Sequence, residues 1–400
     1  MTDTILKADR AALQLMLQVQ PTLTAISNAG TTLQLANKEL LHAGPPILDK
    51  ENMAQPIFNS ALAAVLYEGW AKDIEEAKAL VLSDEVTLTP AQDKNVAVPL
   101  ADVLSASMSV LHVQDANKPN HVAYSTINGG MGPVTRVGII NQEVVDRLHW
   151  IYGPIAKTIG DLLEKQQPAL LPIAEAAVLK GDDLHGATAN SSALLFEALT
   201  KDLEKTDTQE LAFIKDSAAF FLNVWMAACL CTLLAGQNQK HSSAIIRIGS
   251  NGKQFGFQVS GLPEQWFTVE AEAPFIPNAN TEVTSRALGA IGDSAVVDAM
   301  GFGAMLTGYA PDTAARLKLA IDQSKKSAPI GLLTTSHPAL QHMTDFRTGL
   351  CAQAVVELQV GPVVSLGVLD SKGEKGRLDG GFFFAPVEPF ATAVNAINKA

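Results

Sequence analysis

The longest uncharged stretch of the chain constrains its fold more than any other feature. Residues 217–235 read SAAFFLNVWMAACLCTLLA, which is 19 positions without a charged side chain. A helix of that length could span a bilayer, but a helix that is apolar on every face also suits the centre of a large domain. Lys215 and Asp216 lie directly upstream, Asn223 lies within the run, and the sequence has no second such segment. We therefore expect a buried core helix and no membrane span.

The composition is that of a folded chain with a substantial core. The 400 residues are 47% hydrophobic and 18% charged, which argues against disorder and coiled coil. The length allows two or three domains. The formal net charge is −12, and lysine and arginine never form runs longer than a pair. We therefore expect neither a nucleic-acid surface nor a basic membrane patch, so any anionic ligand must be held locally.

The three cysteines, Cys229, Cys231 and Cys351, do not make a disulfide framework. Two of them lie in the uncharged run, where a free cysteine behaves as a small hydrophobe. Their spacing fits no metal site. The amino-terminal sequence MTDTILKADR lacks the apolar region of a signal peptide. The sequence therefore predicts a cytoplasmic protein.

Periodicity predicts an α+β fold in several lobes, the first of which is mixed. Helical patterns occur at 8–19, from Asn59 and after Asp73, which can cap a helix. Extended runs then continue to residue 126, and we assign 1–140 to an amino-terminal α/β lobe. No regular alternation of strands and helices spans the chain, which favours α+β over a single wound sheet.

The middle of the chain, residues 141–240, reads as a helical domain. Asn141 can serve as the N-cap of its first helix. Its last helix is expected to be long, with Thr206 or Asp207 as the cap and an end near Gly236.

Residues 241–400 are expected to form an α+β carboxy-terminal lobe. Asn251-Gly252 between two extended runs is a strong hairpin signal. The runs IGLLTT, AQAVVELQV, PVVSLGVLD and GGFFFAP are also expected to be extended, and 387–398 to close the chain as a helix.

The stretch INGGMGPVTRVG, residues 127–138, places four glycines around the single charge of Arg136. One interpretation is an ordinary turn, because glycine-rich turns far outnumber anion sites. The other is an anion site, in which the glycines let consecutive N–H groups converge and Arg136 supplies the counter-charge.

Two further segments combine glycine with polar side chains. In LHAGPP, His42 beside Gly44 could cap a turn or, when protonated, bind an anion or polarise a carbonyl. In YEGWA, Glu68 interrupts an apolar helix, so it is either buried with a partner or exposed to solvent.

The segment GDDLHG, residues 181–186, could provide metal ligands or an acid–base pair through Asp182, Asp183 and His185. Alternatively, the glycine ends one helix and an aspartate caps the next, although this leaves the histidine unexplained. A metal would need more ligands than this cluster offers, so we predict no metal site.

The carboxy-terminal half adds two glycine-rich segments. In GSNGKQFG the hairpin turn explains Asn251 and Gly252, whereas Gly256 inside a strand indicates a close backbone approach. Gly292-Asp293-Ser294 resembles the start of a phosphate loop, in which Asp293 would orient a donor. Together these segments predict a ligand cleft between lobes.

The order of these motifs resembles one family almost from end to end. The series LLHAGPPI, AVLYEGWA, INGGMGPVTRVG, RLHW, GDDLH, FFLNVWMAAC, NGKQFGFQVSG and IGDSA is similar to the YlbE/YahG-like family of bacterial proteins. This family is a domain of unknown function, and at least one member is a subunit of oxamate carbamoyltransferase in anaerobic allantoin breakdown. The resemblance implies phosphorolysis of oxalurate to oxamate and carbamoyl phosphate, with companion subunits and without a metal or redox cofactor.

The resemblance also implies roles for residues at matching positions. Arg136 and the amides near Gly130 to Gly132 would hold phosphate, and His185 or His42 would polarise the carbamoyl carbonyl. Asp293 would orient a donor, and Asp182 is a further catalytic candidate. The remaining candidates for ligand binding are Gly44, Glu68, Asn128, Asn251, Gly252, Gly256, Gly292 and Ser294.

Several positions depart from the family pattern. The family usually has an acidic residue at Gly129, Asn-Arg at 186–187 and Arg at Ser250, and it has histidines where this chain reads TPAQDKNVAVPL. The sequence therefore leaves two functions open. The chain is either a carbamoyltransferase subunit for a small amide or ureido acid and phosphate, or a non-catalytic scaffold or regulator in such a homo- or hetero-oligomer. A cleft that binds phosphate would favour the first, and Arg136 paired internally would favour the second.

Overall fold

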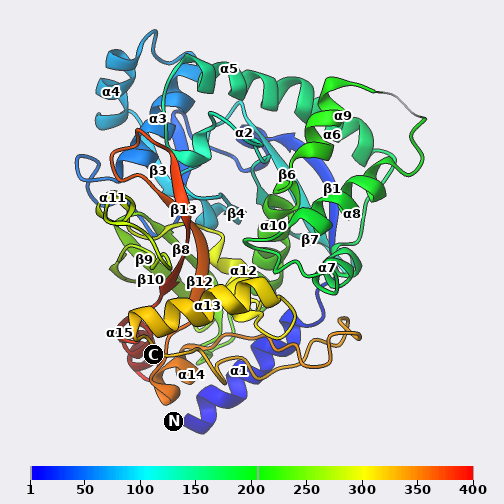
Figure 1. The fold of residues 1–400 in the computed structure, drawn as a ribbon, viewed down its shortest axis with the longest axis vertical. Helices are drawn as coiled ribbons and strands as arrows, with labels where there is room; N and C mark the ends of the chain where they lie inside the picture. Colours follow the sequence, from blue (N-terminus) through cyan, green and yellow to red (C-terminus); the bar gives the residue numbers. More distant parts are fainter. Residues whose placement is uncertain (1, 205–206, 400) are drawn as a thin grey trace.

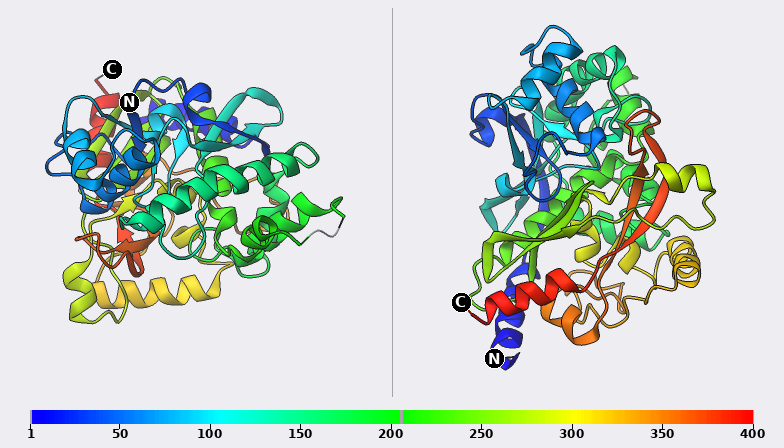
Figure 2. Two further views of the ribbon diagram at one scale, coloured as in Figure 1. Left: turned by 90° about the horizontal axis from the view of Figure 1, so that it is seen from above. Right: turned by 90° about the vertical axis from the view of Figure 1, so that its left-hand side faces the viewer.

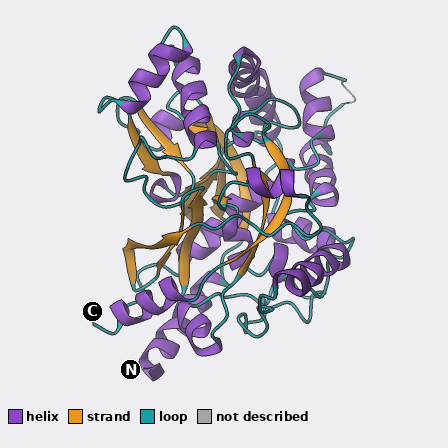
Figure 3. Ribbon diagram, turned by 60° about the vertical axis from the view of Figure 1, so that its left-hand side comes forward, coloured by secondary structure: helices purple, strands orange, loops and turns teal. Residues whose placement is uncertain are grey.

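The computed structural model describes residues 2–204 and 207–399. Within these ranges the strands form four separate sheets, and helices lie around them (Figures 1 and 3). Helices and strands follow no regular alternation, which confirms the predicted α+β class. One hydrophobic core includes residues from all three predicted lobes, whose boundaries remain a prediction.

The first third of the chain supplies two sheets. Their strands are β1 (Pro21–Asn28), β2 (Glu39–His42), β3 (Thr87–Pro90), β4 (Val96–Ala97), β5 (Val103–Leu104), β6 (Ser109–Asp115) and β7 (Lys118–Ser125). The strand orders are β1-β6-β7-β4 and β3-β2-β5. The helices of this third are α1 (Thr2–Met16), α2 (Ala29–Thr32), α3 (Gln55–Tyr67) and α4 (Ile74–Leu82), and it also contains the short turn η1 (Ala91–Lys94). Asp73 caps α4 as predicted, because its carboxylate accepts the N–H of Glu76.

The middle of the chain is helical. Its elements are η2 (Thr135–Val137), α5 (Gln142–Trp150), the π-helical turn η3 (Ile151–Ile155), α6 (Ala156–Leu163), α7 (Leu170–Val178), α8 (Ala189–Thr200), α9 (Gln209–Asp216) and α10 (Phe220–Ala235). The side chain of Asn141 accepts the N–H of Val144, so the predicted cap of α5 is confirmed.

The predicted long helix ending near Gly236 is wrong, because α9 and α10 are two helices bent by 67°. Thr208 caps α9, not Asp207, and Thr206 lies outside the described residues. The break is stabilised by α8, where the Ser192 hydroxyl accepts the N–H of Phe221 and donates to the carbonyl of Ala218. Backbone groups freed by the bend are thereby satisfied.

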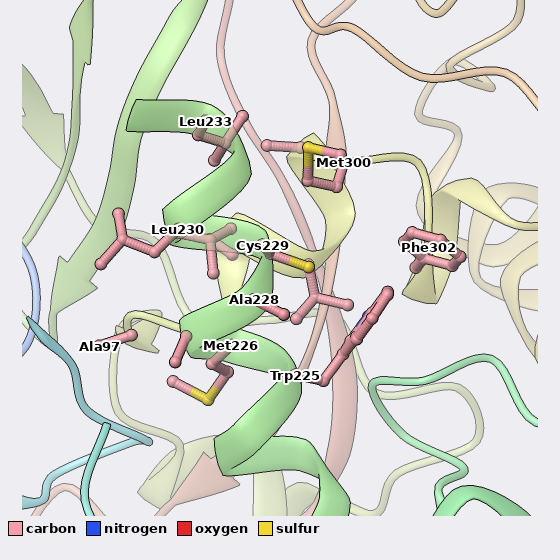
Figure 4. Packing of buried hydrophobic residues seen from close by; sticks show 14 of the residues in the cluster. Ala97, Trp225, Met226, Ala228, Cys229, Leu230, Leu233, Met300 and Phe302 are labelled. Atoms are coloured by element: carbon pink, nitrogen blue, oxygen red, sulfur yellow. The ribbon is translucent and has the colours of Figure 1, made fainter. Parts of the chain in front are cut away.

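Helix α10 contains most of the uncharged run and lies in the core. Figure 4 shows Trp225 and Cys229 on the side of the helix that faces Met300 and Phe302, and the rings of Trp225 and Phe302 meet edge to face at 5.1 Å. The predicted core helix is confirmed. No single helix in the described ranges is long and apolar enough to cross a membrane, and α9 and α10 pass that test only as a bent pair.

The last third contains two further sheets. Their strands are β8 (Ile245–Asn251), β9 (Gln254–Val259), β10 (Leu262–Glu270) and β11 (Ile291–Gly292), in the order β10-β9-β8-β11, and the pair β12 (Val363–Leu369) and β13 (Arg377–Phe384). The predicted hairpin of β8 and β9 is confirmed, with its turn at Gly252-Lys253, one residue later than the predicted Asn251-Gly252. Helix α13 (Pro311–Ser324) packs across β12 and β13, with Leu317 against Val363 and Phe382 (Figure 1).

Two expected strands of this last third are wrong. AQAVVELQV forms α14 (Ala352–Leu358), because Ala352 and Val355 fall on one buried helical face. IGLLTT is a loop, in which Thr335 forms an isolated β-bridge with Thr348. The remaining elements are α11 (Thr281–Arg286), α12 (Ala295–Ala299), η4 (Gly303–Met305) and α15 (Glu388–Ile397), the last of which confirms the predicted closing helix.

Candidate functional site

All predicted site residues except Glu68 occupy three places: the loop 126–138, the turn 181–186 and a junction around Asp293. Glu68 lies apart from all three, at the end of α3. Its carboxylate accepts hydrogen bonds from the N–H and the hydroxyl of Ser107, both at 2.7 Å. This pairing ties α3 to the turn before β6, and a role for Glu68 in ligand binding stays a prediction.

The Asp293 junction consists of Asp293 and the three groups that donate to it. The buried carboxylate accepts hydrogen bonds from the N–H of Gly44 (2.9 Å), the N–H of Val98 (3.0 Å) and the side-chain amide of Gln92 (2.7 Å). Burial raises the pKa of Asp293 to about 7, although the three hydrogen bonds act in the opposite direction. Asp293 therefore joins segments from three sheets.

Two predicted glycines make this junction possible. Gly44 has a φ of +76°, and a Cβ there would lie 2.3 Å from the carbonyl carbon of Ser250. Gly292 has a φ of +114°, and its Cβ would lie 2.7 Å from the backbone nitrogen of Leu100. Both positions require glycine, because a side chain would separate the backbones that meet there. Ser294 follows as a buried residue at the start of α12.

The hairpin of Asn251 borders the same junction. The Asn251 amide donates to the carbonyl of Pro45 at 3.0 Å, and its carbonyl oxygen accepts the N–H groups of Lys253 and Gln254. A cavity of about 380 Å³ opens beside this hairpin, lined by the segment 46–54 and by Asn251, Lys253, Gln254 and Glu270. Two of the predicted motifs, LHAGPP and GSNGKQFG, thus lie side by side.

Gly252 and Gly256 explain how closely these two motifs approach. Gly252 has a φ of +83°, and its Cβ would lie 2.8 Å from the Cβ of Ala54. A Cβ on Gly256 would lie 3.1 Å from the Cβ of Pro45. Both glycines therefore admit the loop after β2, as the strand glycine indicated.

His42 ends β2 in a fully buried position. Its Nδ1 lies 2.8 Å from the carbonyl oxygen of Ala43. Burial lowers the pKa of His42 to about 4, so the imidazole is neutral near pH 7. A role in anion binding would require a charge that this environment opposes.

Asp182 caps helix α8 from outside the helix. One carboxylate oxygen accepts the side-chain amide of Asn190 at 2.9 Å. The other accepts the N–H and the hydroxyl of Ser191 at 2.8 and 2.9 Å. This is the capping arrangement that the sequence left open beside an acid–base role.

His185 forms a buried pair with Asp298. The histidine Nδ1 lies 2.6 Å from a carboxylate oxygen of Asp298, whose other oxygen accepts the N–H groups of Ala304 and Ser365. Burial raises the pKa of Asp298. Asp183 steadies the same turn, because it accepts the N–H of His185 and the hydroxyl of Thr313. The carboxylate fixes the orientation of the imidazole, as in histidines that transfer protons.

The loop 126–138, which we call the glycine–arginine loop, is anchored on α10. The Asn128 amide donates to Asn223 and to the carbonyl of Ala219, at 2.9 and 3.0 Å. Its carbonyl oxygen accepts the N–H of Gly130 at 2.9 Å. Asn223, the polar residue within the uncharged run, therefore serves to hold this loop. Gly132 has a φ of +101° and lies at the exposed end of the loop.

Two arginines bind the carbonyl side of this loop. Arg136 donates to the carbonyl of Gly130 at 2.7 Å, and Arg147 of α5 donates to the carbonyls of Gly129 and Met131, both at 3.1 Å. Burial lowers the pKa of both guanidinium groups. Gly130 (φ +70°) and Gly132 (φ +101°) supply the left-handed backbone in the part of the loop whose carbonyls face the two cations.

A small cavity of about 20 Å³ lies beneath the loop, between Asp102, Arg136, Arg147 and Tyr152. The Nε atoms of both arginines are buried and have no hydrogen-bond partner within 2–204 and 207–399. Asp102 does not neutralise them through an ion pair in the described structure, and its oxygens accept the hydroxyls of Thr126 and Thr135. Unfilled donors of cationic groups are the feature of this site that favours an anion.

Comparison with known proteins gives a family. The protein-family model described as "Oxamate carbamoyltransferase subunit AllG" matches residues 86–294, which is more than half of the chain. The chain belongs to this family. The matched region includes the glycine–arginine loop, the 181–186 turn and Asp293.

Individual relatives extend the family similarity over the full length. "Oxamate carbamoyltransferase subunit AllG" of Escherichia coli K12 is 29% identical over 421 aligned positions, covering 100% of this chain and 99% of that protein. "Uncharacterized protein YahG" of the same strain is 30% identical, covering 83% of this chain and 72% of that protein. The predicted resemblance is thereby confirmed. A crystal structure of a conserved protein of unknown function from Enterococcus faecalis V583 has a TM-score of 0.87 and 26% identity, over 99% of this chain and 98% of that one.

Sequence reasoning did not single out Arg147 or Arg377. Arg147 follows the glycine–arginine loop closely, so its charge within RLHW was an available signal. Arg377 begins β13, and its positive charge lowers the pKa of Arg136 after the larger effect of burial. Nothing local marks Arg377, because the fold alone brings it to the loop.

Proposed function

We propose that this chain is a subunit of a carbamoyltransferase-like complex that handles phosphate and a small amide or ureido acid. The support is the alignment over the full chain with a protein named as an oxamate carbamoyltransferase subunit. Because that protein is named as a subunit, we also propose that this chain acts with companion subunits, in the cytoplasm, as part of an oligomer.

The observation that carries the proposal is the pair of unfilled guanidinium donors beneath the glycine–arginine loop. Arg136 and Arg147 each retain a buried Nε with no partner among the described residues. Phosphate binds guanidinium through two parallel N–H donors, and the burial of these groups strengthens that interaction. We assign phosphate binding to Arg136 and Arg147.

Transfer of the carbamoyl group to phosphate requires attack at the carbamoyl carbon and protonation of the nitrogen that leaves. A phosphate oxygen attacks the carbamoyl carbon, the bond from that carbon to the amide nitrogen breaks, and the nitrogen takes the proton that phosphate brings. His185, oriented by Asp298, is the residue that we assign to polarise the carbonyl or move this proton. Asp298 lies within hydrogen-bond distance of Nδ1, so Nε2 is the ring nitrogen that we assign to the substrate.

A specific observation also favours the second candidate, a non-catalytic scaffold or regulator. Arg136 donates to Gly130, and the N–H of Gly130 is taken by Asn128. The loop is therefore partly paired internally, as expected if this chain had given up phosphate binding. Anion binding measured directly separates the two functions.

The test is the unfolding midpoint of the purified chain with inorganic phosphate, at constant ionic strength. A ligand that binds only the native state raises the midpoint. We expect a rise for the wild type and for Arg10→Ala, in which an exposed arginine of α1 is lost. Arg136→Ala should show no phosphate-induced rise in the midpoint. An equal rise in both variants, or none in the wild type, would support the scaffold instead.

A second measurement addresses turnover. Mixed with its companion subunits, the wild-type chain should support the formation of carbamoyl phosphate. His185→Gln should reduce kcat strongly while phosphate still raises the unfolding midpoint, because the histidine is placed on the carbonyl and not on the anion. Full activity of this variant would remove His185 from the mechanism.

A further inference from the structure

Three arginines from separate parts of the chain form a row, which we call the arginine row: Arg136 of the glycine–arginine loop, Arg377 of β13 and Arg316 of α13. Val137 and Gly376, the chain neighbours of the first two members, lie close together, because a Cβ on Gly376 would lie 3.4 Å from a methyl of Val137. The charge of Arg377 also acts on Arg136, whose pKa it lowers after the larger effect of burial.

Gly380 separates the second and third members of the row. A Cβ on Gly380 would lie 3.3 Å from an Nη atom of Arg377 and 3.5 Å from an Nη atom of Arg316. Arg316 donates to the carbonyl of Gly380 at 2.9 Å, and Arg377 donates to the carbonyl of Asp379 at 3.0 Å. Both guanidinium groups thus lie close to a position that has no side chain.

The row carries positive charge that the described parts of the chain do not neutralise by ion pairing. None of its three arginines has a carboxylate within 4.0 Å in these parts, although Arg286 elsewhere holds two. Burial lowers the pKa of Arg377; of the neighbouring charges, Asp379 raises it and Arg316, with a smaller effect, lowers it. Like charges gathered in a chain of net charge −12 are explained by an anion that binds between them.

The row ends beside the turn that holds His185. Thr313, one helical turn before Arg316 on α13, donates to Asp183 of this turn. On β12, Gly367 meets Arg377 and Ser365 meets Gly186, where the Cβ distances are 3.2 Å to Nε and 3.4 Å to the hydroxyl. Positions two apart on a strand share a face, so β12 presents both contacts on one side.

We propose that Arg316 and Arg377 bind the carboxylate of the amide or ureido acid, next to the phosphate on Arg136. The assignment rests on the proposed function, in which two anionic substrates must react. Their mutual repulsion opposes a shared site, and Arg377, located between the two anions, offsets it. The row would also select acids over neutral amides, because a carboxylate offers two negatively charged acceptor oxygens to the guanidinium groups and an amide offers one neutral oxygen.

Binding of oxamate tests this assignment. Midpoint shifts are measured with oxamate, with oxamide, which has an amide in place of the carboxylate, and with inorganic phosphate. We expect Arg377→Ala and Arg316→Ala to weaken oxamate binding about tenfold and phosphate binding about threefold or less. Oxamide should give no shift. Arg10→Ala controls for the loss of one exposed charge.

Gly380→Ala supplies a variant that keeps every charge. Its methyl group would lie 3.3 and 3.5 Å from Nη atoms of the two guanidinium groups and displace them, so oxamate binding should again fall while phosphate binding persists. Unchanged oxamate binding in all three variants, equal loss of both ligands, or no oxamate shift in the wild type would overturn the carboxylate assignment. A wild type that does not respond to phosphate would instead contradict the proposed function, so the two failures are distinguishable.

Discussion

The Asp293 junction and the arginine row both gather charged groups from distant segments, yet they differ in how these groups are paired. At the junction, the carboxylate of Asp293 accepts three hydrogen bonds from the protein itself. In the row, Arg136 retains a buried donor without a partner in the described chain, and Arg316 and Arg377 bond to carbonyls alone in the same residues. A polar group whose bonding capacity is filled stabilises the fold, whereas unfilled capacity at a cation suits a ligand.

The glycines of the two regions differ in the same way. Gly44 and Gly292 admit another backbone to distances that a Cβ would prevent. Gly380 instead admits two guanidinium groups, whose Nη atoms would lie 3.3 and 3.5 Å from a Cβ there. Glycine therefore admits backbone in one region and two cationic side chains in the other, and sequence alone does not separate these uses.

The largest expected effect is on the junction. Asp293→Ala removes the acceptor for three buried donors, each of which then stays unsatisfied at a cost of about 1–3 kcal/mol. We expect the free energy of unfolding to fall by at least about 3 kcal/mol, measured with urea at pH 7. A loss below about 1 kcal/mol would show that the carboxylate does not hold the three segments together.

The second effect concerns pH. The pKa of Asp293 is raised to about 7 in the fold from an ordinary value of 3.8, so the native state holds this proton more tightly than the unfolded state. Its contribution to stability is present below the unfolded pKa and is lost as pH rises toward 7. Between pH 5 and 7, Asp293→Asn should therefore lose about 2 kcal/mol less stability than the wild type.

His42, in the same region, should give the opposite dependence of the free energy of unfolding on pH. Its pKa is lowered to about 4 from 6.5, so its contribution is complete above pH 6.5 and is lost as pH falls toward 4. The stability of His42→Leu should fall less than that of the wild type over this range. Parallel pH profiles for both variants and the wild type would contradict the assigned burial of these two groups.

The smallest expected effect is on the row. Arg377→Ala removes one hydrogen bond from an exposed side chain, together with the attraction of Asp379 and the smaller repulsion of Arg316. The free energy of unfolding should change by no more than about 0.5 kcal/mol at low salt. A loss above about 1 kcal/mol would mean that the row stabilises the fold, as the junction does.

The sequence predicted much of the fold where local signals decide it. Asp73, Asn141 and the Asn251-Gly252 hairpin are short-range signals, and the structure confirms them. It did not predict the bend before α10, because the hydrogen bonds that stabilise this bend come from α8. The strand expected at 352–360 is a helix for a similar reason, since packing against α15 decides its conformation.

The candidate site was predictable only in part. His185 precedes Gly186 and Arg136 lies in a glycine-rich segment, so both were candidates from the sequence. The fold connects their two segments through β12, β13 and α13. Arg316 and Arg377 lie in sequences that carry no motif. Their relation to the loop depends on contacts between residues far apart in the chain, such as Val137 with Gly376.

The most direct test compares phosphate binding in one variant from each region. Arg136→Ala and Asp293→Asn are unfolded by heat with and without inorganic phosphate. We predict that Arg136→Ala loses the phosphate-induced rise in midpoint, and that Asp293→Asn unfolds at a lower temperature but keeps the full rise. A rise that survives in Arg136→Ala and disappears in Asp293→Asn would contradict the division between a ligand site and a structural junction.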